Sequence, residues 1–365
     1  MSVSTKPAGR PTLRERTFAH PERWFSAGTF FILLVTALKL ASAFFLPVVA
    51  SALLALLLAP PVRWLSKRGL PAGVAAAMVV TGLVVVVSLG IFSLARPAAA
   101  WLSRAPETMA QAQEKIQRIA RPLYNLQRTA AKVQEATANP ASDGARKPAT
   151  VEMAPAGMFA KLPGTTIGFL GAVSTVLFLT FFLLAAGERF SEKLGDIMPE
   201  RYRRQMILGL RDMQAQMSRY LSTSALIRAS LGLATWGVLA LVGLPNPALF
   251  GVTAAILNFI PYIGSLAMLL IIGVASLVSF DTTQQALLAM GAFFVLSLIE
   301  GNVVTPMLLG HRLPLNAVAI FVGLLFWSWI WGVTGAVLAV PLTVLVKVIA
   351  DRVQPLEPLG VILDS

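Results

Sequence analysis

A single carboxylate, Glu300, lies near the end of a long apolar helix predicted in the second half of the chain. An ionisable side chain inside a membrane-spanning segment is costly, so it is a functional candidate by default. Asn302 and Thr305 follow on the same face at helical spacing, and their oxygen atoms can join Glu300 in binding a cation or the hydroxyl groups of a solute. The alternative is that Glu300 lies in the inner interface and pairs with His311 or Arg312.

A second group of polar residues surrounds a break in the apolar segment 249–279. Pro261 has no N–H to donate, and Gly264 can adopt backbone angles that other residues avoid. Asn258 lies beside the carbonyl groups that this break frees, and Tyr262 adds a hydroxyl group or an interfacial ring. Irregular backbone at membrane depth is tolerated only where it lines a cavity or is buried in protein. The break therefore predicts part of a substrate site.

The last apolar segment, 316–349, is also interrupted, at Gly332 and Gly335. Each broken segment follows an unbroken apolar helix, and each half is too short to cross a bilayer, which needs ~20 residues. If the first segment enters from outside and the second from inside, the two form re-entrant hairpins in an inverted repeat. Transporters use such repeats to build a site near the midplane of the bilayer. Kinked, full-length spans are the alternative interpretation.

The sequence has no motif for the common enzyme chemistries. It lacks the phosphate-binding loop of ATPases, the zinc-protease HExxH pattern and a nucleophile elbow. The absence of cysteine excludes disulfides, thiol catalysis and cysteine-ligated zinc, and the two histidines, His20 and His311, are far apart. We therefore expect no enzyme, no cofactor and no metal centre, which leaves ion-driven transport or facilitated flow.

Composition places these residues in a membrane protein. Hydrophobic residues make up 56% of the chain and charged residues only 13%, whereas soluble domains carry ~25% charged residues. About eight hydrophobic segments predict an all-α polytopic fold in contact with membrane lipids. The net charge of +13 does not predict nucleic-acid binding, because no binding module is visible and the basic residues flank the apolar segments.

The charge pattern predicts that both termini are cytoplasmic. From it we expect a cytoplasmic tail at 1–23, three transmembrane helices at 24–95, an extracytoplasmic helical insertion with a linker at 96–161, a fourth transmembrane helix at 162–187, a cytoplasmic amphipathic helix at 188–224, a C-terminal transport repeat at 225–350 and a cytoplasmic tail at 351–365.

The insertion begins with a heptad-like pattern of apolar or small residues that includes Leu102, Met109 and Ala112. This seam can pair with a second copy of the chain or fold back on the membrane domain. The residues leave both possibilities open.

Three C-terminal motifs resemble the autoinducer-2 exporter family of bacterial membrane transporters: NFIPYIG at 258–264, EGNVVTP at 300–306 followed by Gly310, and GVTGAVLAVPL at 332–342. Their order matches the C-terminal half of that family, and the general layout matches over about residues 25–350. The resemblance implies a permease of the bacterial inner membrane that forms a homo-oligomer, and pentameric assembly is reported in the family. It also implies export of a small polar signal molecule, as in some members, or sodium- or lithium-proton antiport, as in others.

Three functional hypotheses follow. The first is secondary export of a small polar metabolite or signal molecule such as autoinducer-2. The second is cation/proton antiport that uses Glu300. The third is a membrane scaffold or regulator that binds partners through the heptad-patterned insertion.

Overall fold

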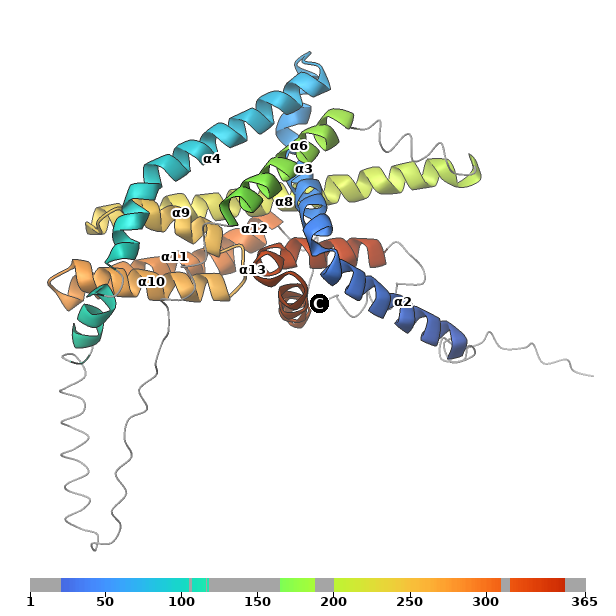
Figure 1. The fold of residues 1–365 in the computed structure, drawn as a ribbon. Coiled ribbons are helices and arrows are strands. Elements are labelled where there is room, and N and C mark those ends of the chain that lie inside the picture. Colours follow the sequence, from blue (N-terminus) through green and yellow to red (C-terminus); the bar gives the residue numbers. More distant parts are fainter. Residues whose placement is uncertain are drawn as a thin grey trace, which may run out of the picture.

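The computed structural model describes residues 21–104, 107–115, 117, 165–187, 200–309 and 316–351. Every regular element within these ranges is helical, which confirms the predicted all-α class (Figure 1). The linker of the insertion, most of both predicted tails and the suggested partners His311 and Arg312 lie outside the described residues.

The elements follow one another as a series of long and short helices. They are α2 (Pro21–Leu40), α3 (Ser42–Lys67), α4 (Ala72–Ser103), α6 (Thr165–Ala186), α8 (Glu200–Val242), α9 (Pro247–Leu257), α10 (Ile263–Ser279), α11 (Thr283–Ile299), the π-helical turn η1 (Glu300–Val304), α12 (Thr305–Leu309) and α13 (Ala317–Ala350). By length and composition, six described helical stretches could cross a bilayer: α3, α4, the apolar part of α6, α8 from Ile207 onward, the run from α11 to α12, and α13. The protein is therefore polytopic, as predicted.

Helix α8 differs from the prediction of two separate helices, an amphipathic one and a spanning one. It is a single helix of 43 residues. No Gly or Pro interrupts the backbone near the expected junction, and the polar residues there are satisfied without a break. The Ser222 hydroxyl group donates to the carbonyl oxygen of Ser218 within α8 and lies 3.2 Å from that of Leu57 in α3. This continuity carries α8 past several other helices, as Figure 1 shows.

The N-terminal helices also shift relative to their predicted ends. The break between α2 and α3 is at Ala41, and Pro47 lies inside α3. A proline inside a helix removes one backbone hydrogen bond, which neighbouring helices can compensate in membrane proteins. Helix α4 continues to Ser103, eight residues beyond the predicted end of the third transmembrane helix at 95, and carries the start of the insertion toward the hairpin formed by α9 and α10.

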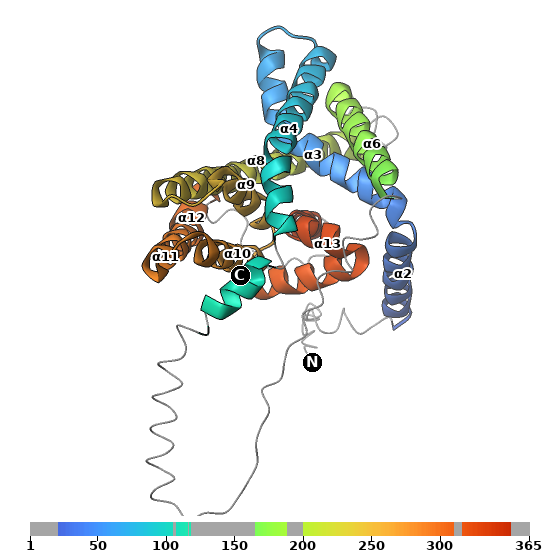
Figure 2. The ribbon, with the colours of Figure 1, turned by 60° about the vertical axis from the view of Figure 1, so that its left-hand side comes forward.

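Three apolar clusters hold the helices together. One joins α2, α3, α8 and both parts of α13, a second joins α8, α9, α10 and α11, and a third joins α3, α4 and α6. Figure 2 shows the corresponding grouping, with α9, α10 and α11 on one side, α3 and α6 on the other, and α13 between them. The first two clusters meet along α8, which therefore links both broken segments.

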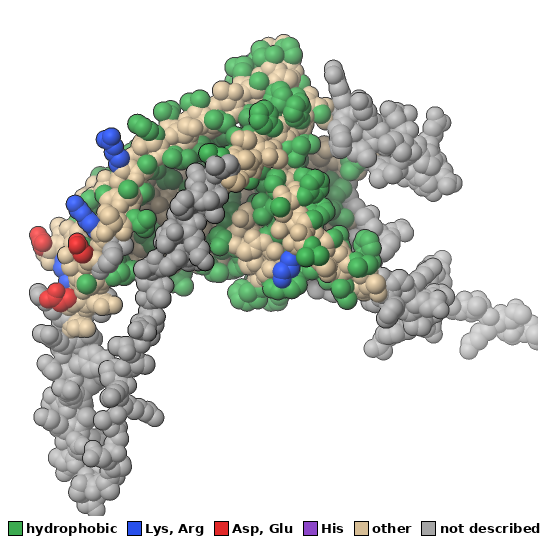
Figure 3. All heavy atoms as spheres, in the orientation of Figure 1, with side chains coloured by type: hydrophobic (Ala, Val, Ile, Leu, Met, Phe, Trp, Pro, Cys, Tyr) green, Lys and Arg blue, Asp and Glu red, His purple; other side chains and the backbone are tan. Residues whose placement is uncertain are grey.

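Large apolar side chains cover much of the outer surface, including Phe92, Leu241 and Met307 at 81%, 89% and 78% exposure. Such exposure would be unfavourable in water, but it fits contact with lipid. On the face shown in Figure 3, most of the visible charged side chains gather where α4 ends and the helical residues 107–115 follow.

Candidate substrate site

The first broken segment folds back on itself. Helices α9 and α10 pack against each other, with a turn at 258–262 between them. A Cβ atom on Gly264 would overlap the carbonyl oxygen of Leu257, so only glycine allows this approach of the two helices. With 11 and 17 residues, α9 and α10 span only about 16 and 25 Å, less than the ~30 Å hydrocarbon core. The hairpin shape agrees with the predicted break, and its entry from one side of a bilayer stays a prediction.

The second broken segment, α13, has the same shape although its backbone hydrogen bonding is nearly continuous. Gly332 (φ 61°, ψ −140°) interrupts the helix in a conformation that glycine favours. A Cβ atom on Gly335 would overlap the carbonyl oxygen of Trp327, and one on Gly323 would overlap the hydroxyl group of Thr343. In a straight helix Gly323 and Thr343 would lie about 30 Å apart. The two halves of α13 therefore pack side by side.

Glu300 lies where the helix after the first hairpin changes its winding. In η1 the backbone N–H of Thr305 donates to the carbonyl oxygen of Glu300, the i→i+5 bond of a π-turn. Such turns are rare and occur frequently at functional sites. The wider turn also brings the Thr305 hydroxyl group within 2.9 Å of Oε1 of Glu300, to which it donates.

The charge partner of Glu300 is Arg228, from the middle of α8. Nη1 of Arg228 donates to the same Oε1 atom, and the two groups form a close ion pair. Both side chains are largely buried, with 21% and 12% of their surfaces exposed. Sequence reasoning missed Arg228, although an arginine in an apolar stretch is itself a signal of function. In the predicted division of the chain a separate segment begins at 225, so Arg228 lay within one turn of a predicted boundary.

A cavity of about 570 Å³ lies beside this ion pair. Among the residues that the structure describes, its hydrogen-bonding lining consists of Tyr220, Ser224 and Arg228 on one face of α8, and Thr305. The rest is apolar and comes from α3, α8, the first hairpin, α12 and α13: Ala50, Leu53, Leu54, Leu57, Leu221, Ala225, Phe259, Pro261, Pro306, Leu309, Ile320, Val337, Leu338, Val340, Pro341 and Val344.

The structure brings together only some of the predicted site residues. Pro261 and Thr305 line the cavity, and Glu300 reaches it through Arg228. Asn302 does not share this face. It is exposed and donates to the carbonyl oxygen of Leu298, because residues two positions apart lie on opposite sides of a helix.

The remaining predicted residues shape the hairpins. Asn258 is buried, its Oδ1 accepts a hydrogen bond from Ser265 at 2.6 Å, and its Nδ2 has no partner among the described residues. Tyr262 is exposed and has a positive φ of 61°. Gly264 and Gly335 allow close packing, and Gly332 allows the turn. The cavity thus meets the tip of the first hairpin and the flank, not the tip, of the second.

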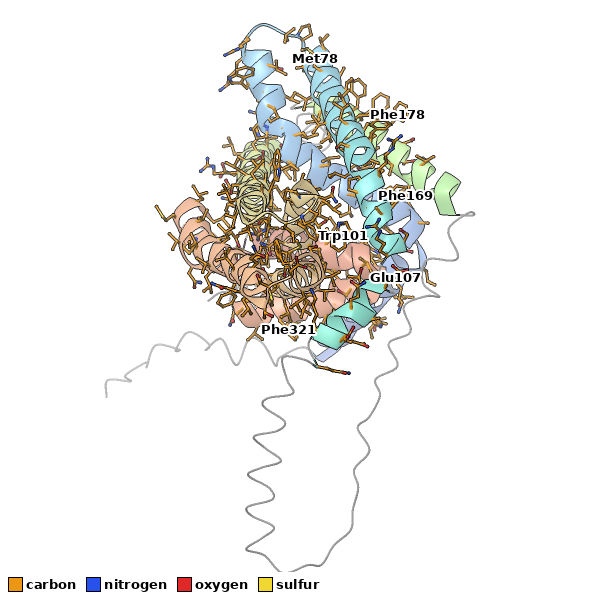
Figure 4. The ribbon with its side chains drawn as sticks, turned by 90° about the vertical axis from the view of Figure 1, so that its left-hand side faces the viewer. Met78, Trp101, Glu107, Phe169, Phe178 and Phe321 are labelled. Carbon is orange, nitrogen blue, oxygen red and sulfur yellow. The ribbon has the colours of Figure 1, made fainter. Side chains whose placement is uncertain are left out.

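The described part of the insertion packs on the first hairpin. Thr108 and Ala112 are buried, and Nζ of Lys115 donates to the carbonyl oxygens of Leu277 and Phe280, both at 2.8 Å, at the C-terminal end of α10. A cation is favourable at this end of a helix. Trp101 of α4, labelled in Figure 4, packs edge-on against a phenylalanine of α9. For residues 107–115 the structure favours folding back on the membrane domain.

Comparison with known proteins matches nearly the whole chain to a family of membrane transporters. Residues 29–354 match the AI-2E family transporter family. The chain is 32% identical to the AI-2 transport protein TqsA of Escherichia coli K12 over 149 residues. This aligned stretch is 41% of this chain and 43% of that protein. It is 30% identical over 198 residues to a provisionally named transport protein of Borreliella burgdorferi, with 54% and 55% covered.

A longer match reaches the provisionally named transport protein YhhT of Escherichia coli K12. The identity is 25% over 311 residues, 85% of this chain and 84% of that protein. The chain thus spans about half the length of the first two relatives and most of the third. Together with the apolar spanning helices and the polar group beside the cavity, the match over residues 29–354 assigns the chain to the AI-2E family of membrane transporters.

Proposed function

We propose that this protein is a secondary transporter that exports a small solute carrying polar groups. AI-2 is the first solute to test, because it stands in the name of one relative. The supporting observation is the cavity bounded by α3, α8, the first hairpin, α12 and α13, with the Arg228–Glu300 pair in its wall. Ionisable groups inside a membrane domain are usually retained at substrate or ion pathways.

Antiport of sodium or lithium against protons is the second candidate, since Glu300 is a buried acid in a candidate span. A guanidinium group already holds Oε1 of Glu300, and Thr305 donates to the same atom. A metal cation at this position would be repelled by Arg228 and would have to displace a charge-assisted hydrogen bond. These contacts favour solute export.

The scaffold hypothesis has less support. The described part of the insertion packs on the chain's own α10, and Lys115 holds it there. A scaffold would need a partner surface on the remainder of the insertion. Deletion of residues 118–135, beyond Lys115, tests this directly, since a scaffold would lose its partners while solute flux stayed intact.

Flux measurements in proteoliposomes distinguish the two transport candidates. Arg228→Gln should reduce solute counterflow at least tenfold, because it removes the main hydrogen-bond donor in the cavity. Arg104→Gln, an exposed arginine outside the cavity, is the matched control. Sodium-dependent proton movement in everted vesicles that disappears in Glu300→Gln, but not in Asp281→Asn, would favour antiport and contradict the export proposal.

We also infer a homo-oligomer in the bacterial inner membrane with both termini cytoplasmic. The basic residues at the C-terminal end of α3, Arg63, Lys67 and Arg68, support this orientation, because cytoplasmic loops and their flanks are enriched in lysine and arginine. The chain has no cysteine, so single introduced cysteines report topology without a background signal. A cysteine at Lys67 should react only from the cytoplasmic side, and one at Arg104 only from the other side.

A further inference from the structure

We infer that the cavity beside Arg228 takes an uncharged amphiphile, whose head group accepts hydrogen bonds and whose body is apolar. This inference rests on the proposed transport function and narrows its solute. It is carried by three features of the cavity: the arrangement of its lining, the direction of its free hydrogen bonds and its charge balance.

The lining is divided into a polar wall and an apolar remainder. Of the twenty described residues that form it, four can make side-chain hydrogen bonds. Three of these, Tyr220, Ser224 and Arg228, are four residues apart and therefore lie along one face of α8. Thr305 is the fourth, and its hydroxyl group meets Arg228 at the shared oxygen of Glu300. A ligand that fits this division has its polar atoms at one end.

Arg228 is the donor-only group of the polar wall, whereas the hydroxyl groups of Tyr220, Ser224 and Thr305 can also accept. A guanidinium group carries five N–H bonds and no acceptor. The Arg228 side chain lines the cavity, and among the described residues its guanidinium group makes one hydrogen bond, from Nη1 to Glu300. The Thr305 hydroxyl group donates its proton to Glu300, so toward the cavity it can only accept. A head group that meets the remaining N–H groups of Arg228 therefore has to accept hydrogen bonds, as carbonyl and ether oxygens do.

The charge balance favours a neutral head group. Arg228 lines the cavity and Glu300 does not. The ion pair with Glu300 nevertheless neutralises the positive charge that Arg228 brings to the lining. An anionic head group would add a second negative charge beside this pair in a poorly hydrated place, and a cationic head group would face the guanidinium. An isolated charge in such surroundings is strongly disfavoured. A neutral acceptor leaves the pair intact.

The apolar remainder requires an apolar body. Sixteen of the lining residues present only carbon side chains. Hydroxyl groups turned toward these side chains would lose hydration and find few partners, so the part of the solute that faces them has to be apolar. A volume of about 570 Å³ is within the usual range for small-molecule sites, so there is room for a head group and a short chain.

The test uses a matched series of ligands. N-acylglycinamides with acyl chains of four, six and eight carbons are compared with the N-acylglycinates of the same lengths, which differ only in a terminal carboxylate. Binding to the protein in lipid nanodiscs is measured by equilibrium dialysis, and binding to empty nanodiscs is subtracted. We expect the amides to bind about fourfold more tightly per added methylene group until the cavity is full. We expect the carboxylates to bind at least tenfold more weakly.

Four variants locate the binding. Arg228→Gln should weaken amide binding at least tenfold, and Arg104→Gln should leave it unchanged. Ala225→Phe adds a ring on the cavity wall and should abolish binding of the eight-carbon amide before that of the four-carbon amide. Since Arg228→Gln leaves Glu300 without its partner, Arg228→Lys is measured as well. It keeps the charge but lacks the forked donors, so it should bind amides more weakly than the wild type while running as a folded protein in gel filtration.

Two results would overturn the inference: carboxylates that bind as tightly as the amides, or amide binding that does not exceed that of empty nanodiscs. AI-2 flux in proteoliposomes that the amides do not inhibit would also overturn it, and would leave the transport function standing. Amide binding that depends on Arg228, in a protein that moves neither AI-2 nor the amides, would support the binding site and contradict the proposed transport function.

Discussion

Helices α8 and α9 approach so closely at Gly232 and Gly251 that neither position has room for a side chain. A Cβ atom on Gly232 would lie 2.7 Å from the carbonyl oxygen of Gly251, and one on Gly251 would lie 2.6 Å from that of Gly232. Small residues at such crossings let backbones pack directly in membrane proteins. We predict that Gly232→Ala separates the two helices. It should also weaken transport, because Arg228 lies one turn away on the same helix.

The size of the effect follows from the same distances. A Cβ atom essentially never approaches a heavy atom closer than 3.0 Å, and the added methyl group would also lie 2.8 Å from Cβ of Ala255. The backbones would have to move apart by a few tenths of an ångström. Overpacking of this kind costs about 1–3 kcal/mol. Gly237→Ala is the matched control, since it lies in the same helix and its added methyl group would meet nothing within 4 Å.

Comparing the two variants isolates the overlap. Both replace glycine by alanine within α8, so both gain the same ~0.5–1 kcal/mol of helix propensity. The difference between their free energies of unfolding should therefore be about 1–3 kcal/mol, with Gly232→Ala the less stable. Denaturant titration of the protein in mild detergent measures it. Equal stability of the two variants would refute the close crossing of α8 and α9.

Three further predictions concern the ion pair, the insertion and the second hairpin. Arg228→Met and Glu300→Met should each destabilise the protein by about 2–4 kcal/mol, because each leaves a buried charge unpaired. The double variant leaves no unpaired charge, so its loss of stability should be much smaller than the sum of the two. Additive losses in a denaturant titration would contradict this. Lys115→Met should remove about 1–2 kcal/mol from the docking of residues 107–115 and increase their hydrogen exchange about five- to thirtyfold, whereas Lys67→Met should leave that exchange unchanged. Gly335→Ala should lower the thermal midpoint more than Gly291→Ala, whose added methyl group meets open space; similar midpoints would argue against the fold-back of α13.

The sequence predicted the breaks well because they depend on local chemistry. Pro261 and Gly264 mark the first turn, and Gly332 and Gly335 mark the second, since proline and glycine act on the backbone at their own positions. The close contact of Gly232 and Gly251 was not predicted. It depends on where two helices cross, and small residues occur at many other positions in this chain.

The site itself was only partly predictable. Glu300 and Thr305 were identified, because a carboxylate in an apolar helix is unusual wherever it occurs. Asn302 was placed on the wrong face, because residues two positions apart lie on opposite sides of a helix. The partner of Glu300 was sought among the nearest basic residues, and it lies 72 positions away.

The amino-acid sequence by itself determined a helical membrane protein with two interrupted C-terminal segments and one buried acid, because hydrophobicity and backbone freedom belong to individual residues. The tertiary structure decided which groups meet. The continuity of α8 brings Arg228 to Glu300, and the fold-back of α13 supplies one wall of the cavity. Both depend on the packing of helices that are remote in sequence, where burial and charge compensation over the whole domain select one arrangement.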